Sequence, residues 1–216
     1  TTADFAFTLL VSAARRVVEG VEYVREGRWK TWGPTLLLGR DLYQATIGIV
    51  GFGRIGKEMA KRARGFDMNI LAFDSYRDEA AARELGVTFV ELDELLAQSD
   101  FVSLHCALTP ETRHLIGARE LGLMKKEAIL VNAARGPVVD TDALTTALRD
   151  GTIWSAALDV TDPEPLPPDH PLIFMSNCIV VPHIASATVH TRDNMATLAV
   201  NNALAVIRGT RPLHCV

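Results

Sequence analysis

Residues 46–56 read Thr-Ile-Gly-Ile-Val-Gly-Phe-Gly-Arg-Ile-Gly, and this stretch decides the fold. It opens with an apolar, β-branched run of the kind that forms a fully buried parallel strand, and three glycines follow at Gly-x-Gly-x-x-Gly spacing. Residues 57–66 place apolar side chains on one helical face and basic ones largely on the other, and 69–73 form a second apolar run. The pattern predicts a β-α-β unit of about thirty residues, the length that this motif requires.

The glycine loop has the form of a dinucleotide-binding turn. Gly51 permits the tight turn, Gly53 lets the backbone approach a pyrophosphate, and Gly56 lets the helix pack closely on the strand. The N-terminus of the helix then offers free N–H groups and a partial positive charge to phosphate. We therefore expect these glycines to contact the cofactor together with Arg54, a phosphate partner, and Ile55.

The second predicted strand leads directly to an acidic residue. Asp74 lies 18 residues beyond Gly56, where a carboxylate can accept hydrogen bonds from both ribose hydroxyls of an adenosine. It would repel a 2′-phosphate, and Arg77 nearby is the residue that could offset this repulsion. The sequence thus favours NAD over NADP without excluding NADP. The alternative, a glycine-rich turn chosen for packing alone, does not explain the terminal acid.

Composition limits the classes of protein to consider. The 216 residues, 48% of them hydrophobic, can bury a large core and exceed one standard α/β domain by a modest margin. A net charge of −4, without any Lys/Arg block, argues against nucleic acid and membrane as partners. The apolar stretch 5–14 is too short to span a bilayer and lacks the form of a signal peptide.

The three cysteines, Cys106, Cys178 and Cys215, have no metal-ligand spacing, and we expect each to be a small buried hydrophobic residue. Their low, odd number suits a reducing compartment. We therefore expect a cytoplasmic protein without a metal site.

We divide the chain into three parts: residues 1–34, a helix and a tryptophan loop; 35–187, the NAD-binding domain; and 188–216, a C-terminal linking helix and tail. The first helix is expected to run unbroken from Asp4 to Arg25, and because the sequence begins inside it, we expect a segment to precede it in the natural gene product. Trp29 and Trp32 follow, either as a satellite cluster over the core or as a subunit contact.

After Asp74, predicted strands alternate with predicted helices. This alternation implies an α/β fold, a doubly wound, Rossmann-type parallel sheet covered on both faces, with right-handed crossovers. A rigid loop explains the proline-rich residues 163–171. Further strands are expected at 87–90, 101–105, 128–132, 153–159 and 178–181. Further helices are expected at 78–85, 92–98, 115–124, 140–149 and 188–207.

Polar residues gather where ligands bind in such a sheet, beyond the carboxyl ends of the strands. Residues 132–136 (Asn-Ala-Ala-Arg-Gly) follow one strand, 158–160 (Leu-Asp-Val) end the next, Glu164 lies in the proline-rich loop, and 182–186 (Pro-His-Ile-Ala-Ser) follow the last. Arg, Glu and His at one edge could bind an anion and transfer a proton. A purely structural ion pair is the alternative.

These motifs resemble the D-isomer-specific 2-hydroxyacid dehydrogenase family along essentially the whole chain. The branch closest in appearance is that of the glyoxylate and hydroxypyruvate reductases, through residues 158–172 and the paired tryptophans. The resemblance rests on the glycine loop, Asp74, Val-Asn-x-x-Arg-Gly at 131–136, Leu-Asp-Val at 158–160, Glu-Pro at 164–165 and Pro-His-Ile at 182–184.

The resemblance implies that a small 2-oxo acid, of the glyoxylate or hydroxypyruvate type, is reduced by NADH to the D-2-hydroxy acid. It makes His183 the acid/base, Glu164 its partner, Arg135 the substrate anchor and Asp159 the carboxylate that orients the nicotinamide carboxamide. It implies further cofactor contacts at His105, Thr109, Ala133, His183 and Ala185.

Two departures from the family pattern stand out. Residues 105–109 read His-Cys-Ala-Leu-Thr, with Ala107 where the family usually has proline, which loosens a loop near the adenine. The substrate lobe that precedes the first helix in the family is missing, so we expect this chain alone to bind the cofactor without turning over substrate. The family also implies a homodimer, here built on 4–25 and the Trp29–Trp32 loop.

Three other functions remain open. The first is an NAD-sensing binding protein such as a transcriptional corepressor, which keeps the same site residues on this scaffold. Formate dehydrogenase shares the scaffold but pairs its histidine with glutamine, so Glu164 argues against it. Phosphoglycerate dehydrogenase often carries a C-terminal regulatory domain, and none follows Val216 in this sequence.

Overall fold

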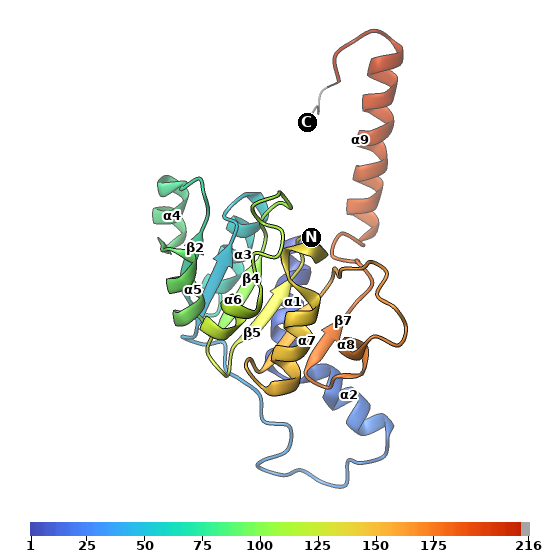
Figure 1. Cartoon of the computed structure of the whole chain (residues 1–216). Helices are drawn as coiled ribbons and strands as arrows, with labels where there is room; N and C mark the ends of the chain where they lie inside the picture. Colours follow the sequence, from blue (N-terminus) through green and yellow to red (C-terminus); the bar gives the residue numbers. More distant parts are fainter. Residues whose placement is uncertain (213–216) are drawn as a thin grey trace.

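A seven-stranded parallel sheet forms the centre of the chain (Figure 1), whose residues 1–212 are described by this computed structural model. Cys215 and the end of the predicted C-terminal tail lie outside the described residues. The strand order β3-β2-β1-β4-β5-β6-β7 confirms the doubly wound, Rossmann-type fold. The strands are β1 (Thr46–Val50), β2 (Asn69–Phe73), β3 (Val87–Phe89), β4 (Phe101–Leu104), β5 (Ile129–Asn132), β6 (Ser155–Leu158) and β7 (Cys178–Val180).

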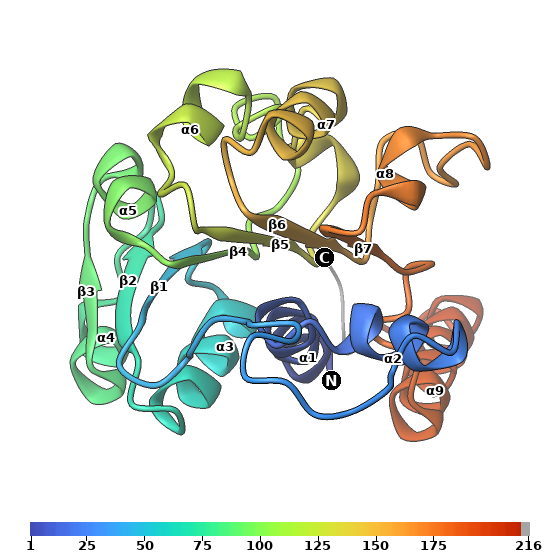
Figure 2. The same cartoon turned by 90° about the horizontal axis from the view of Figure 1, so that it is seen from below.

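Helices cover both faces of this sheet (Figure 2), and each face has its own hydrophobic cluster. The helices α1, α3 and α4 pack on one face, and α5, α6, α7 and the short α8 pack on the other. The faces are closed because the strands are apolar on both sides, as the sequence indicated. These helices are α1 (Thr2–Ala14), α3 (Arg54–Arg64), α4 (Glu79–Leu85), α5 (Leu92–Gln98), α6 (Ala118–Leu123), α7 (Thr141–Asp150) and α8 (Pro171–Phe174).

The predicted β-α-β unit is confirmed as β1, α3 and β2. Gly51 has a φ of +95°, and a Cβ there would lie 2.5 Å from the backbone N of Cys106. A Cβ on Gly56 would lie 2.1 Å from the carbonyl O of Gly51. Both positions therefore require glycine, one for its backbone conformation and both for the close approach of neighbouring backbone.

The prediction of one unbroken helix from Asp4 to Arg25 is wrong. The chain breaks between α1 and α2 (Val17–Arg25), where Arg16 adopts a left-handed conformation with a φ of 53°. The N–H of Arg40 donates to the carbonyl O of Ala14 at 2.8 Å, a group that a continuous helix would have used itself. Seven residues of α1 are buried and none of α2 is, so the break separates a core helix from a surface helix.

Other boundaries differ by smaller amounts. The helix predicted at 115–124 begins at Ala118, because Ile116 instead forms a parallel bridge with Val139. Cys106 and Cys178 are free and are partly buried against one of the two core clusters, rather than buried within it as expected. Burial raises the pKa of both thiols, that of Cys178 to about 12.

Two surface segments have few contacts with the body. The helix α9 (Val189–Ile207) extends away from the sheet and has no buried residue (Figure 1). Trp29 and Trp32 are 60% and 78% exposed, so the two tryptophans do not form a satellite cluster over the core.

Within the described residues, no helix is long and apolar enough to cross a membrane. The division into 1–34, 35–187 and 188–216 stays a prediction.

Candidate active site

The glycine loop leaves room for a ligand where the sequence places a pyrophosphate. Gly53 lies directly before the first turn of α3, and a Cβ on it would meet no atom within 4 Å. The protein's own packing therefore does not demand glycine at this position, whereas close approach of a phosphate does. Arg54 and Ile55 begin the helix beside this space and are exposed. The loop and the N–H groups of α3 thus fit the pyrophosphate of a dinucleotide.

Asp74 also holds the glycine loop in place. One carboxylate oxygen accepts the N–H of Phe52 at 2.6 Å, and the other accepts the N–H of Tyr76 at 3.0 Å. The guanidinium of Arg77, the possible partner of a 2′-phosphate, donates to Glu91 at 2.6 Å. The positive charge of Arg77 is therefore already paired with Glu91. The negative charge of Asp74 is left without a cation from Arg77 at the end of β2.

The loop after β4 leaves the His105 residue partly buried. Its Nε2 lies 2.9 Å from Oγ of Ser103, and its Nδ1 is buried without a partner among residues 1–212. Burial lowers the pKa of His105 to about 4, so the imidazole is neutral at pH 7. Thr109 lies further along the same loop, where its N–H donates to Oγ1 of Thr112 at 2.8 Å.

The structure brings His183 and Glu164 together. Nδ1 of His183 lies 2.7 Å from Oε1 of Glu164, and the two side chains are 48% and 42% exposed. The backbone of His183 is left-handed, with a φ of 53°. These residues line a cavity of about 740 Å³ together with Asp159.

Asp159 is buried at 1% exposure and fixes the loop that carries His183. Its two carboxylate oxygens accept the N–H of Ile184 at 2.7 Å and the N–H of Ala185 at 3.0 Å. The N–H of His183 donates to the carbonyl O of Asp159 at 2.9 Å. One residue at the end of β6 thus anchors three consecutive backbone N–H groups.

Arg135 is exposed in the turn after β5, and Ala133 of the same turn is buried. The Arg135 guanidinium donates to the carbonyl O of Ala134 at 2.6 Å. Among residues 1–212, no hydrogen bond or ion pair joins it to His183 or Glu164. The arrangement thus offers a free cation at the same sheet edge as an imidazole held by a carboxylate, which can bind an anion and transfer a proton.

Sequence reasoning assigned no role to Asn132, Ser103 or Gly136. Asn132 is 1% exposed and hydrogen-bonds the turn of Arg135 through both ends of its amide. A Cβ on Gly136 would lie 1.8 Å from the carbonyl O of Thr161, in the loop that leads to Glu164. The asparagine could have been found from the sequence, because a polar residue closes an otherwise apolar strand there.

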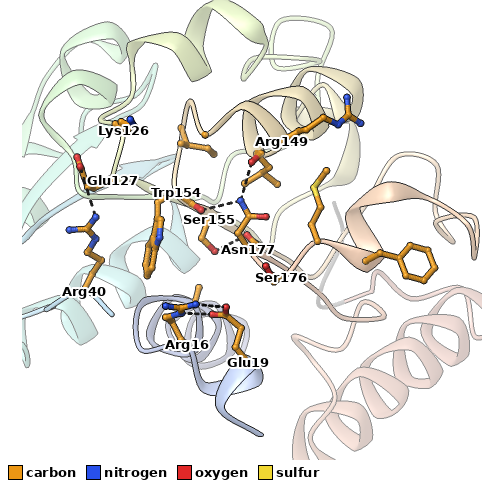
Figure 3. A pocket seen from close by; sticks show the side chains of 16 residues that line it. Arg16, Glu19, Arg40, Lys126, Glu127, Arg149, Trp154, Ser155, Ser176 and Asn177 are labelled. Atoms are coloured by element: carbon orange, nitrogen blue, oxygen red, sulfur yellow. Dashed lines mark hydrogen bonds and ion pairs between the residues drawn. The ribbon is translucent and has the colours of Figure 1, made fainter. Parts of the chain in front are cut away.

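A second cavity lies at the opposite, amino end of the sheet (Figure 3) and has a volume of about 680 Å³. Its charges are largely paired: Arg16 makes two 2.8 Å hydrogen bonds to Glu19, and Arg40 lies 4.0 Å from Glu127 and over the ring of Trp154. No histidine lines it. In the part of the chain from 1 to 212, no three His, Cys, Asp or Glu side chains are grouped to hold a metal ion.

Comparison with known proteins identifies the family of this chain. Residues 7–185 match the family model of the D-isomer specific 2-hydroxyacid dehydrogenase, NAD binding domain. A glyoxylate reductase of Korarchaeum cryptofilum is 54% identical over all of this chain, which spans 65% of that relative's length.

Solved structures give the same result. The TT0316 protein of Thermus thermophilus is 51% identical with a TM-score of 0.93, over 99% of this chain and 67% of its own. A D-lactate dehydrogenase of Lactobacillus jensenii, solved with NAD+, is 31% identical with a TM-score of 0.88, over 100% of this chain and 68% of its own. The chain belongs to the D-isomer-specific 2-hydroxyacid dehydrogenase family, of which it comprises the NAD-binding domain.

Proposed function

We propose that the protein containing this chain reduces a small 2-oxo acid of the glyoxylate or hydroxypyruvate type to the D-2-hydroxy acid. The 2.7 Å contact between His183 and Glu164, at the sheet edge that also carries Arg135, is the observation that carries this proposal. The name of the relative from Korarchaeum, glyoxylate reductase, supports the choice of substrate.

His183 is the proton donor in this proposal. Since Nδ1 faces Glu164, the other ring nitrogen, Nε2, is the one that can reach a substrate. The imidazolium donates the Nε2 proton to the carbonyl oxygen of the 2-oxo acid, while Glu164 keeps the ring in one orientation. In the reverse direction, neutral Nε2 accepts the proton of the hydroxyl group.

Arg135 holds the substrate, because a planar guanidinium can donate two parallel hydrogen bonds to a carboxylate. Bound NADH supplies the hydride for C2 of the 2-oxo acid. The glycine loop and the N-terminus of α3 hold the pyrophosphate, Asp74 the adenosine ribose, and Asp159 the nicotinamide carboxamide. We further propose contacts at His105, Thr109, Ala133 and Ala185, whose loops end at the same edge.

The proposed cofactor preference is for NAD over NADP. A 2′-phosphate would lie beside the carboxylate of Asp74, and the only basic side chain proposed to offset it, Arg77, is paired with Glu91. The proposal includes a cytoplasmic location, which the free thiols of Cys106 and Cys178 support.

We also propose that the protein is a homodimer. Trp29 and Trp32 are exposed on a loop beside α2, which itself exposes Val18, Val21 and Val24. Exposed aromatic and aliphatic side chains at this density are typical of subunit interfaces. Sedimentation of the full-length protein should give a dimer that Trp32→Ala weakens. A monomer at micromolar concentration, unchanged by the substitution, would contradict the proposal.

The full-length protein tests the activity. We expect NADH oxidation at neutral pH with glyoxylate or hydroxypyruvate, little NADH oxidation with a phosphorylated 2-oxo acid, and little NAD+ reduction with formate. A protein that binds NADH tightly but turns over no 2-oxo acid would instead favour the NAD-sensing function.

A further inference from the structure

We infer that Asn132 is a positioning residue that fixes the direction of the Arg135 guanidinium, an inference that rests on the function proposed above. Asn132 is the last residue of β5 and is 1% exposed. Its Nδ2 donates to the carbonyl O of Arg135 at 3.0 Å, and its Oδ1 accepts the N–H of Ala134 at 3.0 Å. The donor and the acceptor of the buried Asn132 amide are therefore both hydrogen-bonded to the turn that carries Arg135.

The two hydrogen bonds enclose the peptide group that holds the guanidinium. Nη1 of Arg135 donates to the carbonyl O of Ala134 at 2.6 Å, and that carbonyl belongs to the peptide between Ala134 and Arg135. The groups bound by Asn132 lie one on each side of this peptide. Rotation of the peptide would move its carbonyl and the guanidinium with it, and the amide of Asn132 opposes that rotation.

Neighbouring backbone closes the other side of the turn. Gly136 packs so tightly on Thr161 that a Cβ would lie 1.8 Å from the Thr161 carbonyl O. The carbonyl O of Asn132 accepts the N–H of Asp159 at 2.9 Å, at the end of β6. The turn of Arg135 is thus held between the Asn132 amide and the loop that leads to Glu164, which places the anchor and the proton-donating pair in one connected unit.

Core packing alone does not explain why residue 132 is an asparagine. Ile129, Leu130 and Val131 precede it in β5 and are fully buried, so an apolar side chain would extend the core without the cost of burying an amide. The two hydrogen bonds offset this cost only if the turn keeps its present conformation. Selection for the direction of Arg135, rather than for core stability, accounts for the asparagine.

A double-mutant cycle in the full-length protein tests the inference. Asn132→Asp keeps the shape of the side chain but replaces the Nδ2 donor by a carboxylate oxygen. We expect it to lower kcat/KM for the 2-oxo acid by about tenfold to a hundredfold, mostly through KM, because a small misplacement of a binding group costs this much. The affinity for NADH should change less than about twofold. In an Arg135→Ala background, the same substitution should have almost no further effect on kcat/KM.

Two further measurements separate positioning from general destabilisation. Protonation of the introduced carboxyl restores a donor towards the Arg135 carbonyl, so the ratio of parent to variant kcat/KM should shrink as the pH is lowered. Asn177→Asp is the matched control, because Asn177 also donates through Nδ2 to backbone, to the carbonyl groups of Leu148 and Trp154, but at the amino end of the sheet. The control should lose thermal stability without a change in KM.

The outcomes are distinguishable. If Asn132→Asp lowers kcat/KM by the same factor with and without the Arg135 side chain, or if Asn177→Asp raises KM equally, the inference is wrong. Where Asn132→Asp does not fold, Asn132→Ser enters the same cycle. A parent enzyme that reduces no 2-oxo acid, or an Arg135→Ala variant with parental kcat/KM, overturns the proposed function and the inference with it. An impaired Arg135→Ala variant with additive effects overturns the inference alone.

Discussion

Two cavities of similar volume each carry a charged pair: one of about 740 Å³ extends along β7 to His183 and Glu164 beyond its carboxyl end, and one of about 680 Å³ lies at the amino end of the sheet. At the amino end, Arg16 caps the start of α2 and pairs with Glu19 in the first turn of the same helix. At the carboxyl end, His183 and Glu164 lie on loops and form a half-exposed pair. The backbone of Arg16 and that of His183 are both left-handed, so this conformation does not separate the two ends. Cavity size and charge therefore do not locate the chemistry. An imidazole paired with a carboxylate, at the sheet edge that also carries the open glycine loop, does.

The largest effect should come from the imidazole at the carboxyl end. In the full-length protein, His183→Ala should lower kcat by about a hundredfold to ten-thousandfold, the usual contribution of a positioned general acid, with NADH affinity nearly unchanged. Steady-state kinetics and a fluorescence titration of NADH measure the two quantities. A His183→Ala variant with near-parental kcat would mean that the His183–Glu164 pair is structural, as the Arg16–Glu19 pair at the amino end is.

The partly buried imidazole of His105, whose Nδ1 lacks solvent and a partner within residues 1–212, should make stability depend on pH. Its pKa is lowered from 6.5 to about 4 in the folded protein, so between these values the unfolded chain binds a proton that the folded chain does not. Stability should be fully present above pH 6.5 and should fall by up to about 3 kcal/mol as the pH drops to 4.

Denaturant unfolding at several pH values, for the parent and for His105→Gln, measures this slope. The glutamine variant should lack the part of the slope between pH 6.5 and 4. His190→Gln, at an exposed position on α9, is the control and should keep the parental slope. Identical slopes in all three proteins would mean that His105 is not buried in solution.

Asp74 should discriminate between the two nicotinamide cofactors. We expect this chain to bind NADH more tightly than NADPH by about 1 to 3 kcal/mol, given a charge repulsion screened by an effective dielectric of about 20. Asp74→Asn should reduce the difference while keeping an acceptor for the N–H of Phe52. Fluorescence titrations with both cofactors decide the matter, with Asp142→Asn, an exposed carboxylate on α7, as the control. Equal parental affinities would show that Arg77 leaves Glu91 for the phosphate.

The smallest effect should come from the amino end. Arg16→Ala should lower the free energy of unfolding by about 1 kcal/mol, near the upper range for ion pairs of this exposure, with kcat unchanged. Arg25→Ala removes the more exposed pair with Glu22 and should have almost no effect. If Arg16→Ala lost activity without losing stability, the pair at the amino end would be functional rather than structural, which contradicts this prediction.

Sequence reasoning succeeded where a feature depends on neighbours in the chain. The positive φ of Gly51 and the close approach of Gly56 to the Gly51 carbonyl are set within one turn, and the strand and helix on either side follow from periodicity. Asn132 is also local, since within residues 1–212 its amide bonds only to Ala134 and Arg135. It was missed because a polar strand end was interpreted as part of a motif rather than as a hydrogen-bonding group.

Features set by distant segments could not be predicted. The break at Arg16 depends on Arg40, which takes the carbonyl of Ala14. The start of α6 depends on the bridge between Ile116 and Val139. The sequence placed His183 and Glu164 at one edge, but only the fold brings them to 2.7 Å.

The left-handed backbone of His183 also limits which residues this position can accept over evolutionary time. Glycine, asparagine, aspartate and histidine tolerate the conformation, whereas β-branched and bulky side chains do not. A lineage that stopped catalysing but kept NAD binding could exchange the histidine for glycine or asparagine at almost no backbone cost. The backbone conformation at this position therefore restricts the residue types that can replace the histidine once proton transfer is no longer needed.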